Sequence, residues 1–165
     1  GGMGSGGGRG MNGGGVGLVS ARTSAPAPCA ETPELIALAT ASAKWGWMYI
    51  SHMRNESDNL LESVDELIAI ARASGGPAEI YHLKEAGKGN WGKLDGVIQR
   101  VEAARASGVR ISANMYTYVA GATGLDAAMP PWVRAGGYDA WAARMTDPGD
   151  RARLPAERTV KPVVL

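Results

Sequence analysis

The 165-residue sequence lacks the features of secreted, membrane and nucleic-acid-binding proteins. Its single cysteine, Cys29, excludes an internal disulfide, and the N-terminus lacks the charged and then apolar layout of a secretory signal. No apolar run approaches the roughly 20 residues that cross a bilayer. Basic side chains number 17 and acidic ones 16, without a long run of one sign, which argues against nucleic acid or an anionic membrane as a partner. We therefore expect a cytoplasmic protein.

The composition, 45% apolar and 20% charged, suits one globular domain with a core of ordinary size. Residues 1–31 are rich in glycine and proline and are predicted to form a flexible lead-in, because ordering glycine costs much backbone entropy. Gly-Gly-Gly-Val-Gly at 13–17 superficially suggests a phosphate-binding loop. No apolar strand precedes it, so a nucleotide-binding module is the weakest of three hypotheses.

From residue 32 onward, helical and strand patterns alternate. Thr32 is predicted as a helix N-cap with Pro33 as the first helical residue. Helices are expected from residue 32 to Gly46, from 60 to Gly75 and from 94 to Gly108, with short strands at 47–51, 78–81 and 109–115. This order predicts a parallel α/β sheet over residues 32–118. Residues 119–165 are expected to form a segment outside the strand-and-helix repeat, an excursion or a lid, with short helical candidates at 138–145 and 148–154.

The only two histidines occupy equivalent positions in the repeat. His52 directly follows the first predicted strand and His82 the second. Neighbouring strands lie roughly 4.8 Å apart, so both imidazoles can reach one metal ion at about 2.0–2.1 Å per Zn–N bond. Tyr116 and Tyr118 follow the third strand at the same rim, where α/β barrels build their active sites. The alternative is that these are ordinary loop histidines and packing aromatics.

Several motifs at these strand ends together resemble a known family. They are Ser51-His-Met-Arg-Asn-Glu56, Tyr81-His-Leu-Lys84 with Gly87, Asn90-Trp-Gly-Lys93, Asn114-Met-Tyr-Thr-Tyr118, and Gly124-Leu-Asp126 through Pro130-Pro-Trp132. In order and spacing, over residues 32–154, they resemble the N-acyl-D-amino-acid deacylase family of the amidohydrolase superfamily. The resemblance implies a metal-dependent (β/α)₈ TIM barrel, of which this chain would supply the central part, about three βα units.

The resemblance also implies an activity and its site residues. We expect a zinc-dependent hydrolase that releases the acyl group from a small N-acyl-D-amino acid, with His52 and His82 as ligands of Zn²⁺. Lys84 and Arg54 each lie two residues beyond a histidine and are the candidates to bind the substrate carboxylate. Tyr116 is a candidate donor to the substrate or oxyanion. The alternative for both cations is a solvated loop position.

The sequence also departs from the family. A complete barrel needs roughly 250 residues. The His-x-His pair, the bridging metal ligand and the late aspartate that would act as general base are absent, so no catalytic residue is identified. Four family positions carry other residues: Tyr81 in place of Ser, Asn114 in place of Asp, Thr117 in place of Pro and Ala122 in place of Ser. The change at Asn114 predicts weaker support around the metal centre, and that at Ala122 a weaker substrate contact.

Two further groups of polar residues receive structural interpretations. Cys29 precedes a helix in a proline-rich loop and is interpreted as a free thiol rather than the family's bridging cysteine. Glu56, Asp58 and Glu62 are interpreted as supporting the start of the following helix. The main alternative to a hydrolase is a noncatalytic α/β fragment that oligomerises or docks onto another chain to cover its strand edges.

Overall fold

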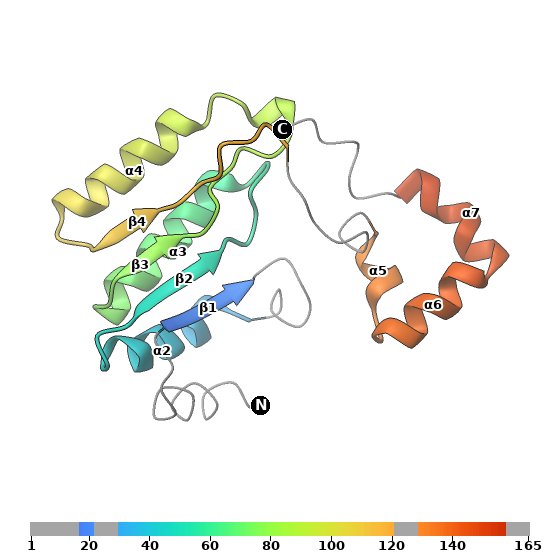
Figure 1. Cartoon of the computed structure of the whole chain (residues 1–165), viewed down its shortest axis with the longest axis horizontal. Coiled ribbons are helices and arrows are strands. Elements are labelled where there is room, and N and C mark those ends of the chain that lie inside the picture. Colours follow the sequence, from blue (N-terminus) through green and yellow to red (C-terminus); the bar gives the residue numbers. More distant parts are fainter. Residues whose placement is uncertain (1–16, 22–29, 121–128, 158–165) are drawn as a thin grey trace. The chain divides into compact units, whose positions relative to one another are not determined.

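Four parallel strands in the order β1-β2-β3-β4 form one sheet in the computed structural model, which describes residues 17–21, 30–120 and 129–157 (Figure 1). The strands are β1 (Gly17–Ala21), β2 (Met48–His52), β3 (Ala78–Ile80) and β4 (Ile111–Ala113). They are connected in turn by α2 (Thr32–Ala43), α3 (Leu60–Ser74) and α4 (Leu94–Ala106). Three βα units followed by a fourth strand confirm the predicted α/β class and agree with a partial barrel.

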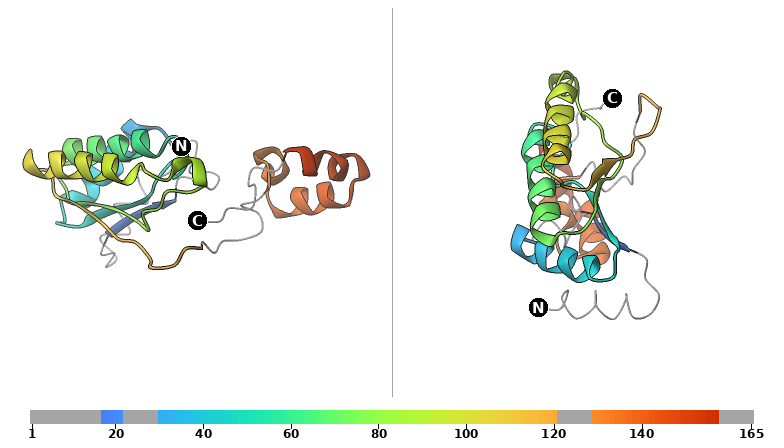
Figure 2. Two further views of the ribbon diagram at one scale, coloured as in Figure 1. Left: turned by 90° about the horizontal axis from the view of Figure 1, so that it is seen from above. Right: turned by 90° about the vertical axis from the view of Figure 1, so that its left-hand side faces the viewer.

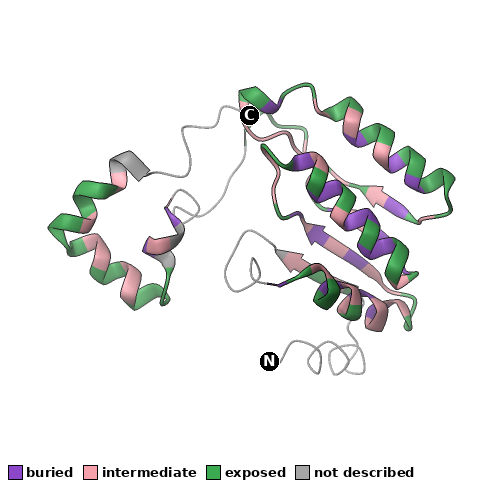
Figure 3. Ribbon diagram, turned by 180° about the vertical axis from the view of Figure 1, so that it is seen from behind, coloured by how far each residue is buried: buried purple, intermediate pink, exposed green. Residues whose placement is uncertain are grey.

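Helices α2, α3 and α4 cover one face of the sheet (Figure 2). Side chains alternate across a strand, so Tyr49 and Ser51 in β2 are buried beneath the helices, whereas Met48, Ile50 and His52 are only partly buried. Buried and exposed positions alternate along these helices (Figure 3), and the buried ones form one hydrophobic core with residues of the strands. Members of this core include Leu35, Leu60, Val64, Leu67, Ile70, Ile80 and Val97.

The helix ends confirm the predicted glycine stop of α3 and correct the predicted N-cap of α2. Helix α3 ends at Gly75, whose φ of 68° is left-handed and whose N–H donates to the carbonyl of Ala71, as the glycine stop predicted. The predicted cap of α2 is wrong, because Glu31 occupies the N-cap. Thr32 instead donates its hydroxyl to Glu66 Oε1 at 2.7 Å, which links α2 to α3.

Strand β1 corrects the prediction that residues 1–31 form a flexible lead-in. Residues 17–21 pair in parallel with β2, with Val19 opposite Ile50. Ser20 Oγ also lies 2.6 Å from Tyr49 Oη. The pairing partner stabilises a strand too short to be recognised between glycine- and proline-rich flanks. Residues 1–16 and 22–29, which include Cys29 and most of the glycine motif, lie outside the described residues.

The chain divides into two compact units, residues 1–117 and 118–165; the predicted division followed residue 118. The second unit contains α5 (Pro131–Arg134), α6 (Tyr138–Thr146) and α7 (Pro148–Glu157). Both predicted helices of this region are present, and α5 was not predicted. Arg144 Nη1 donates to the carbonyl of the buried Val133 at 2.9 Å, which links α6 to α5. Among the described residues, no helix combines the length and apolar character needed to cross a membrane.

Candidate metal centre

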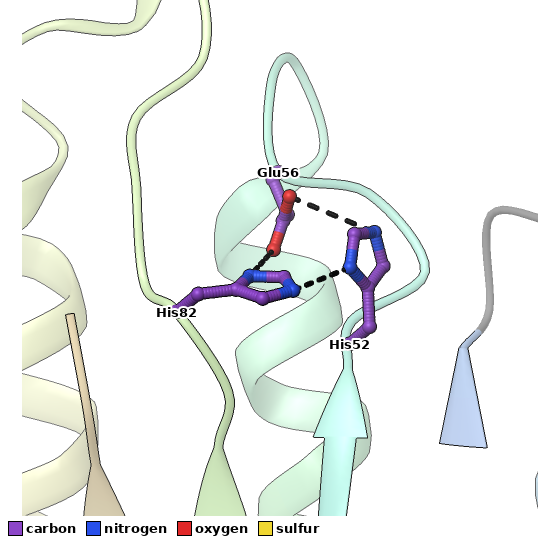
Figure 4. A group of neighbouring side chains, drawn as sticks. All are labelled: His52, Glu56 and His82. Carbon is purple, nitrogen blue, oxygen red and sulfur yellow. Dashed lines mark hydrogen bonds and ion pairs between the residues drawn. The ribbon is translucent and has the colours of Figure 1, made fainter. Parts of the chain in front are cut away.

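The carboxyl ends of β2 and β3 bring the two histidines together. His52 is the last residue of β2, and His82 lies two residues beyond the end of β3. Their ring centroids are 4.4 Å apart, and His52 Nδ1 lies 2.7 Å from His82 Nε2 (Figure 4). Both side chains are accessible, at 25% and 21% of their surface. The sheet thus places both imidazoles at one rim, as parallel strands require.

Glu56 is a third member of this cluster, although its sequence position predicted a role at the start of the following helix. Its Oε1 lies 3.0 Å from His82 Nδ1, and its Oε2 lies 3.7 Å from His52 Nε2. The carboxylate therefore contacts the outer nitrogen of each ring, while the inner nitrogens face each other (Figure 4). Helix α3 begins only at Leu60, and Glu62 is the acidic residue of its first turn. The spacing of four residues between His52 and Glu56 was the available signal.

Asn55 shapes the loop that presents Glu56. Its Oδ1 accepts hydrogen bonds from the backbone N–H groups of Ser57 at 2.8 Å and Asn59 at 3.1 Å. The backbone N–H of Asn55 donates to Ser63 Oγ at 3.0 Å. Side chains of this type stabilise tight loops by replacing backbone partners. The loop therefore folds back over the strand end and holds the Glu56 carboxylate against the imidazoles.

Lys84 also joins the cluster. Its Nζ lies 2.6 Å from Glu56 Oε2 and 2.6 Å from His82 Nδ1. Burial lowers the pKa of Lys84, and the hydrogen bond and charge of Glu56 oppose that shift. The ammonium lies 5.9 Å from the centre of the Tyr116 ring. Burial, and then the charge of Glu56, raise the pKa of Tyr116. Two of the predicted substrate-binding residues thus lie at the imidazole cluster.

Arg54 is directed to other partners. Its guanidinium makes two hydrogen bonds to the Glu66 carboxylate, at 2.7 and 3.0 Å, and a third to the carbonyl of Ala30 at 3.1 Å. The sequence predicted that a cation two residues beyond His52 points toward the same rim as the histidine. Glu66 in α3 instead draws the side chain toward the helix layer, so the structure does not bring Arg54 into the histidine cluster.

The donor set suits zinc. Ligand atoms of His52, Glu56 and His82 lie within 4.8 Å of one another. Tetrahedral zinc with Zn–N bonds of about 2.0–2.1 Å separates two nitrogens by about 3.3 Å, so the facing nitrogens need to part only slightly from their present 2.7 Å. Burial is the main factor that lowers the pKa of His52, and this favours the neutral imidazole that binds metals.

No family model matches the chain. It is 34% identical over 113 residues to N-acyl-D-glutamate deacylase from Alcaligenes xylosoxydans xylosoxydans, and 32% identical over 113 residues to D-aminoacylase from the same organism. Each alignment covers 68% of this chain and 23% of the relative. The chain therefore spans about a quarter of the length of these curated relatives.

Solved structures show the same similarity. N-acyl-D-glutamate deacylase from Bordetella bronchiseptica, in complex with zinc and a phosphonate mimic of the tetrahedral intermediate, has a TM-score of 0.62 and 31% identity over 63% of this chain and 22% of its own. A D-aminoacylase structure has a TM-score of 0.64 and 32% identity, covering 67% and 23%. Another, from work on the binuclear metal centre of D-aminoacylase, has a TM-score of 0.68 and 26% identity, covering 93% and 34%.

Proposed function

We propose, from the premise that this chain's homologues are N-acyl-D-amino-acid deacylases of the amidohydrolase family, that it carries part of the metal centre of a zinc-dependent amide hydrolase. The reaction would remove the acyl group from an N-acyl-D-amino acid. The observation that carries this proposal is the pair of imidazole nitrogens facing each other at 2.7 Å, at the rim where two parallel strands end. A cytoplasmic location and a small-molecule substrate, without nucleic acid, belong to the same proposal.

In this proposal, His52 Nδ1 and His82 Nε2 would hold the zinc ion. When bound, it would supply Lewis acidity toward the acyl carbonyl and toward the water nucleophile. The Glu56 carboxylate lies 3.0 Å from the outer nitrogen of His82 and would accept the proton that this nitrogen carries when Nε2 binds zinc, with Lys84 keeping Glu56 as its partner. Glu56 would thus orient the His82 imidazole through its outer nitrogen.

Lys84 and Tyr116 are the residues that we assign to the substrate. The Lys84 ammonium is 18% exposed beside the imidazoles and suits a carboxylate partner. Because Glu56 already binds it at 2.6 Å, a substrate carboxylate would share or replace that contact. Tyr116 lies next to Lys84 and carries a hydroxyl donor. Arg54 is left out of this assignment because Glu66 and Ala30 bind its guanidinium.

Zinc analysis and hydrolysis of N-acetyl-D-methionine and N-acetyl-D-glutamate by the purified chain test the proposal. We expect stoichiometric zinc in the wild-type chain, loss of zinc in the His52→Asn and His82→Gln variants, and hydrolysis of a D-substrate only where zinc is bound. Arg100→Gln is the control, since Arg100 pairs with Asp65 on the helix surface. A wild-type chain without zinc and without activity would contradict the proposal.

The exposed edges of the sheet favour a second candidate, a noncatalytic α/β fragment that docks onto another chain. Among the described strands, β1 and β4 each have one neighbour. Val19 in β1 is 65% exposed, and unpaired strand edges promote association. Light scattering after size exclusion separates the candidates: a monodisperse monomer that binds zinc supports the hydrolase, and a zinc-free oligomer supports the fragment.

A further inference from the structure

We infer that Asn114 and Glu79 are a positioning pair for His82, in which the Asn114 amide couples the Glu79 carboxylate to the His82 main chain. The inference rests on the proposed metal centre. From the sequence, asparagine in place of aspartate at this position is predicted to weaken the support around the metal centre. The contacts of Asn114 indicate the opposite, because its amide has two different partners that aspartate cannot serve in the same way.

His82 adopts a backbone conformation that needs external support. Its φ of 42° is the one positive value for a non-glycine residue among those the structure describes. Such a conformation is disfavoured by contacts of the β-carbon and persists where surrounding groups hold it. The backbone N–H of His82 donates to Asn114 Oδ1 at 2.6 Å. The side chain of Asn114 therefore holds the strained turn directly.

Backbone hydrogen bonds on either side of this contact fix the position of Asn114. Its N–H donates to the carbonyl of Ile80 at 3.0 Å, and its carbonyl accepts from the N–H of Leu83 at 2.8 Å. The segments that follow β3 and β4 are thus joined both before and after His82. Because these two bonds involve only backbone atoms, they remain available when the side chain at 114 is changed.

Glu79 determines which side chain fits at position 114. Its carboxylate accepts a hydrogen bond from Asn114 Nδ2, and its Oε2 accepts from Ser112 Oγ at 2.9 Å. A side chain between the His82 N–H and a carboxylate must offer one acceptor and one donor, which an amide does. An ionised aspartate offers acceptors alone and would place a second negative charge beside Glu79. The half-buried setting of both residues strengthens that repulsion.

The pair acts on the proposed metal centre through the geometry of His82. The inner nitrogens of the two imidazoles are 2.7 Å apart, so a change in the His82 backbone moves Nε2 relative to His52 Nδ1. Groups that orient a ligand side chain commonly affect metal affinity by roughly 10–100-fold. Asn114 is therefore a positioning residue, which acts through His82.

The test compares Asn114→Asp, Glu79→Gln and the double variant in the full chain. Asn114→Asp keeps the size and the acceptor but loses the donor and adds a charge. In the double variant the glutamine amide can donate to the aspartate, so the pattern is restored with the roles exchanged. Glu79→Gln alone still offers an acceptor to Asn114 Nδ2. Ser112→Ala is the control, because it removes the other partner of Glu79 and leaves Asn114 unchanged.

Two measurements are made on each variant: the exchange rate of the His82 amide in zinc-free protein, and the zinc dissociation constant by competition with a chromophoric chelator. We expect Asn114→Asp to speed exchange and to weaken zinc binding roughly 10-fold or more. The double variant should recover most of both losses, and Glu79→Gln and Ser112→Ala should stay near wild type. Unchanged exchange in Asn114→Asp, or a double variant no better than the single one, overturns the inference.

The same measurements distinguish failure of this inference from failure of the proposed function. If the wild-type chain binds no zinc, the metal proposal falls, and exchange of the His82 amide alone decides whether the pair holds the backbone. Circular dichroism monitors folding. An Asn114→Asp chain that fails to fold while the double variant folds supports the coupling. Loss of fold in both variants overturns it, because relief of the charge repulsion would then have no effect.

Discussion

At the scale of single residues, the two ring nitrogens of each imidazole have different partners. The inner nitrogens of His52 and His82 face each other, and Glu56 contacts the outer ones. A carboxylate in that position selects the nitrogen that remains free to bind a metal. Glu56 is only 10% exposed, so solvent competes weakly for its oxygens. The Glu56 carboxylate is therefore placed to orient the His82 ring, and it lies within ion-pair distance of His52.

Removing the charge of Glu56 should weaken zinc binding. Glu56→Gln keeps the shape but presents a weaker acceptor to His82 and Lys84, and we expect zinc affinity to fall roughly 10–100-fold. Chelator competition measures the change. The control is Asp58→Asn, which removes an exposed carboxylate from the same loop. Equal affinities in the two variants would show that Glu56 does not orient the histidines.

Tyr49 should make the stability of the fold sensitive to alkaline pH. Burial raises its pKa above the ordinary value of 10.0, and the hydrogen bonds to Ser20 and Ser51 partly oppose that shift. The folded state therefore holds the phenolic proton more tightly than the unfolded state does. This contribution to the free energy of unfolding is complete below pH 10 and is lost as pH rises through 10 and beyond.

Urea unfolding of wild type and Tyr49→Phe between pH 7 and 11 measures this contribution. At pH 7 the variant should be less stable by about 1 kcal/mol, because it lacks the hydroxyl that lies 2.6 Å from Ser20 Oγ. The difference should shrink above pH 10. Tyr138→Phe, at a site that is 73% exposed, is the control. A difference that stays constant up to pH 11 would argue against the burial effect.

At the scale of elements, the sequence predicted those boundaries that depend on local chemistry. Glycine marks the end of α3 because Gly75 adopts a left-handed conformation that other residues reach only at a cost. Strand β1 was missed because its pairing with β2 is a contact between distant segments. The N-cap of α2 was misplaced for the same reason, since Thr32 binds Glu66 of another helix.

The segment between α3 and β3 depends on a close approach at Gly76. A β-carbon at this position would lie 2.8 Å from the Cβ of Ala43 in α2. Overpacking of this kind typically costs about 1–3 kcal/mol, so Gly76→Ala should lower the free energy of unfolding by that amount. Denaturant unfolding measures it. In the control Gly89→Ala, the added methyl meets nothing within 4 Å, and a similar loss there would reject the steric explanation.

At the scale of the whole molecule, the site residues that could be predicted are those whose positions follow from the repeat of strand and helix. His52 and His82 were placed together because the ends of adjacent parallel strands share a rim. Glu56 and Arg54 have partners that the sequence did not predict, because the directions of loop side chains depend on tertiary contacts, here with His82 for one and with Glu66 for the other. Asn114 was interpreted from its difference from the family, without knowledge of its partner Glu79.

In the proposed metal centre the two imidazoles share one zinc ion, and the chain contains no other histidine. Long-range ¹H–¹⁵N spectra of the imidazole rings, recorded during a zinc titration of the full chain, test whether both rings bind the same ion. We predict that both rings change together and saturate at one zinc per chain, with coordination shifts at His52 Nδ1 and His82 Nε2. A change in only one ring, or in neither, would contradict the claim.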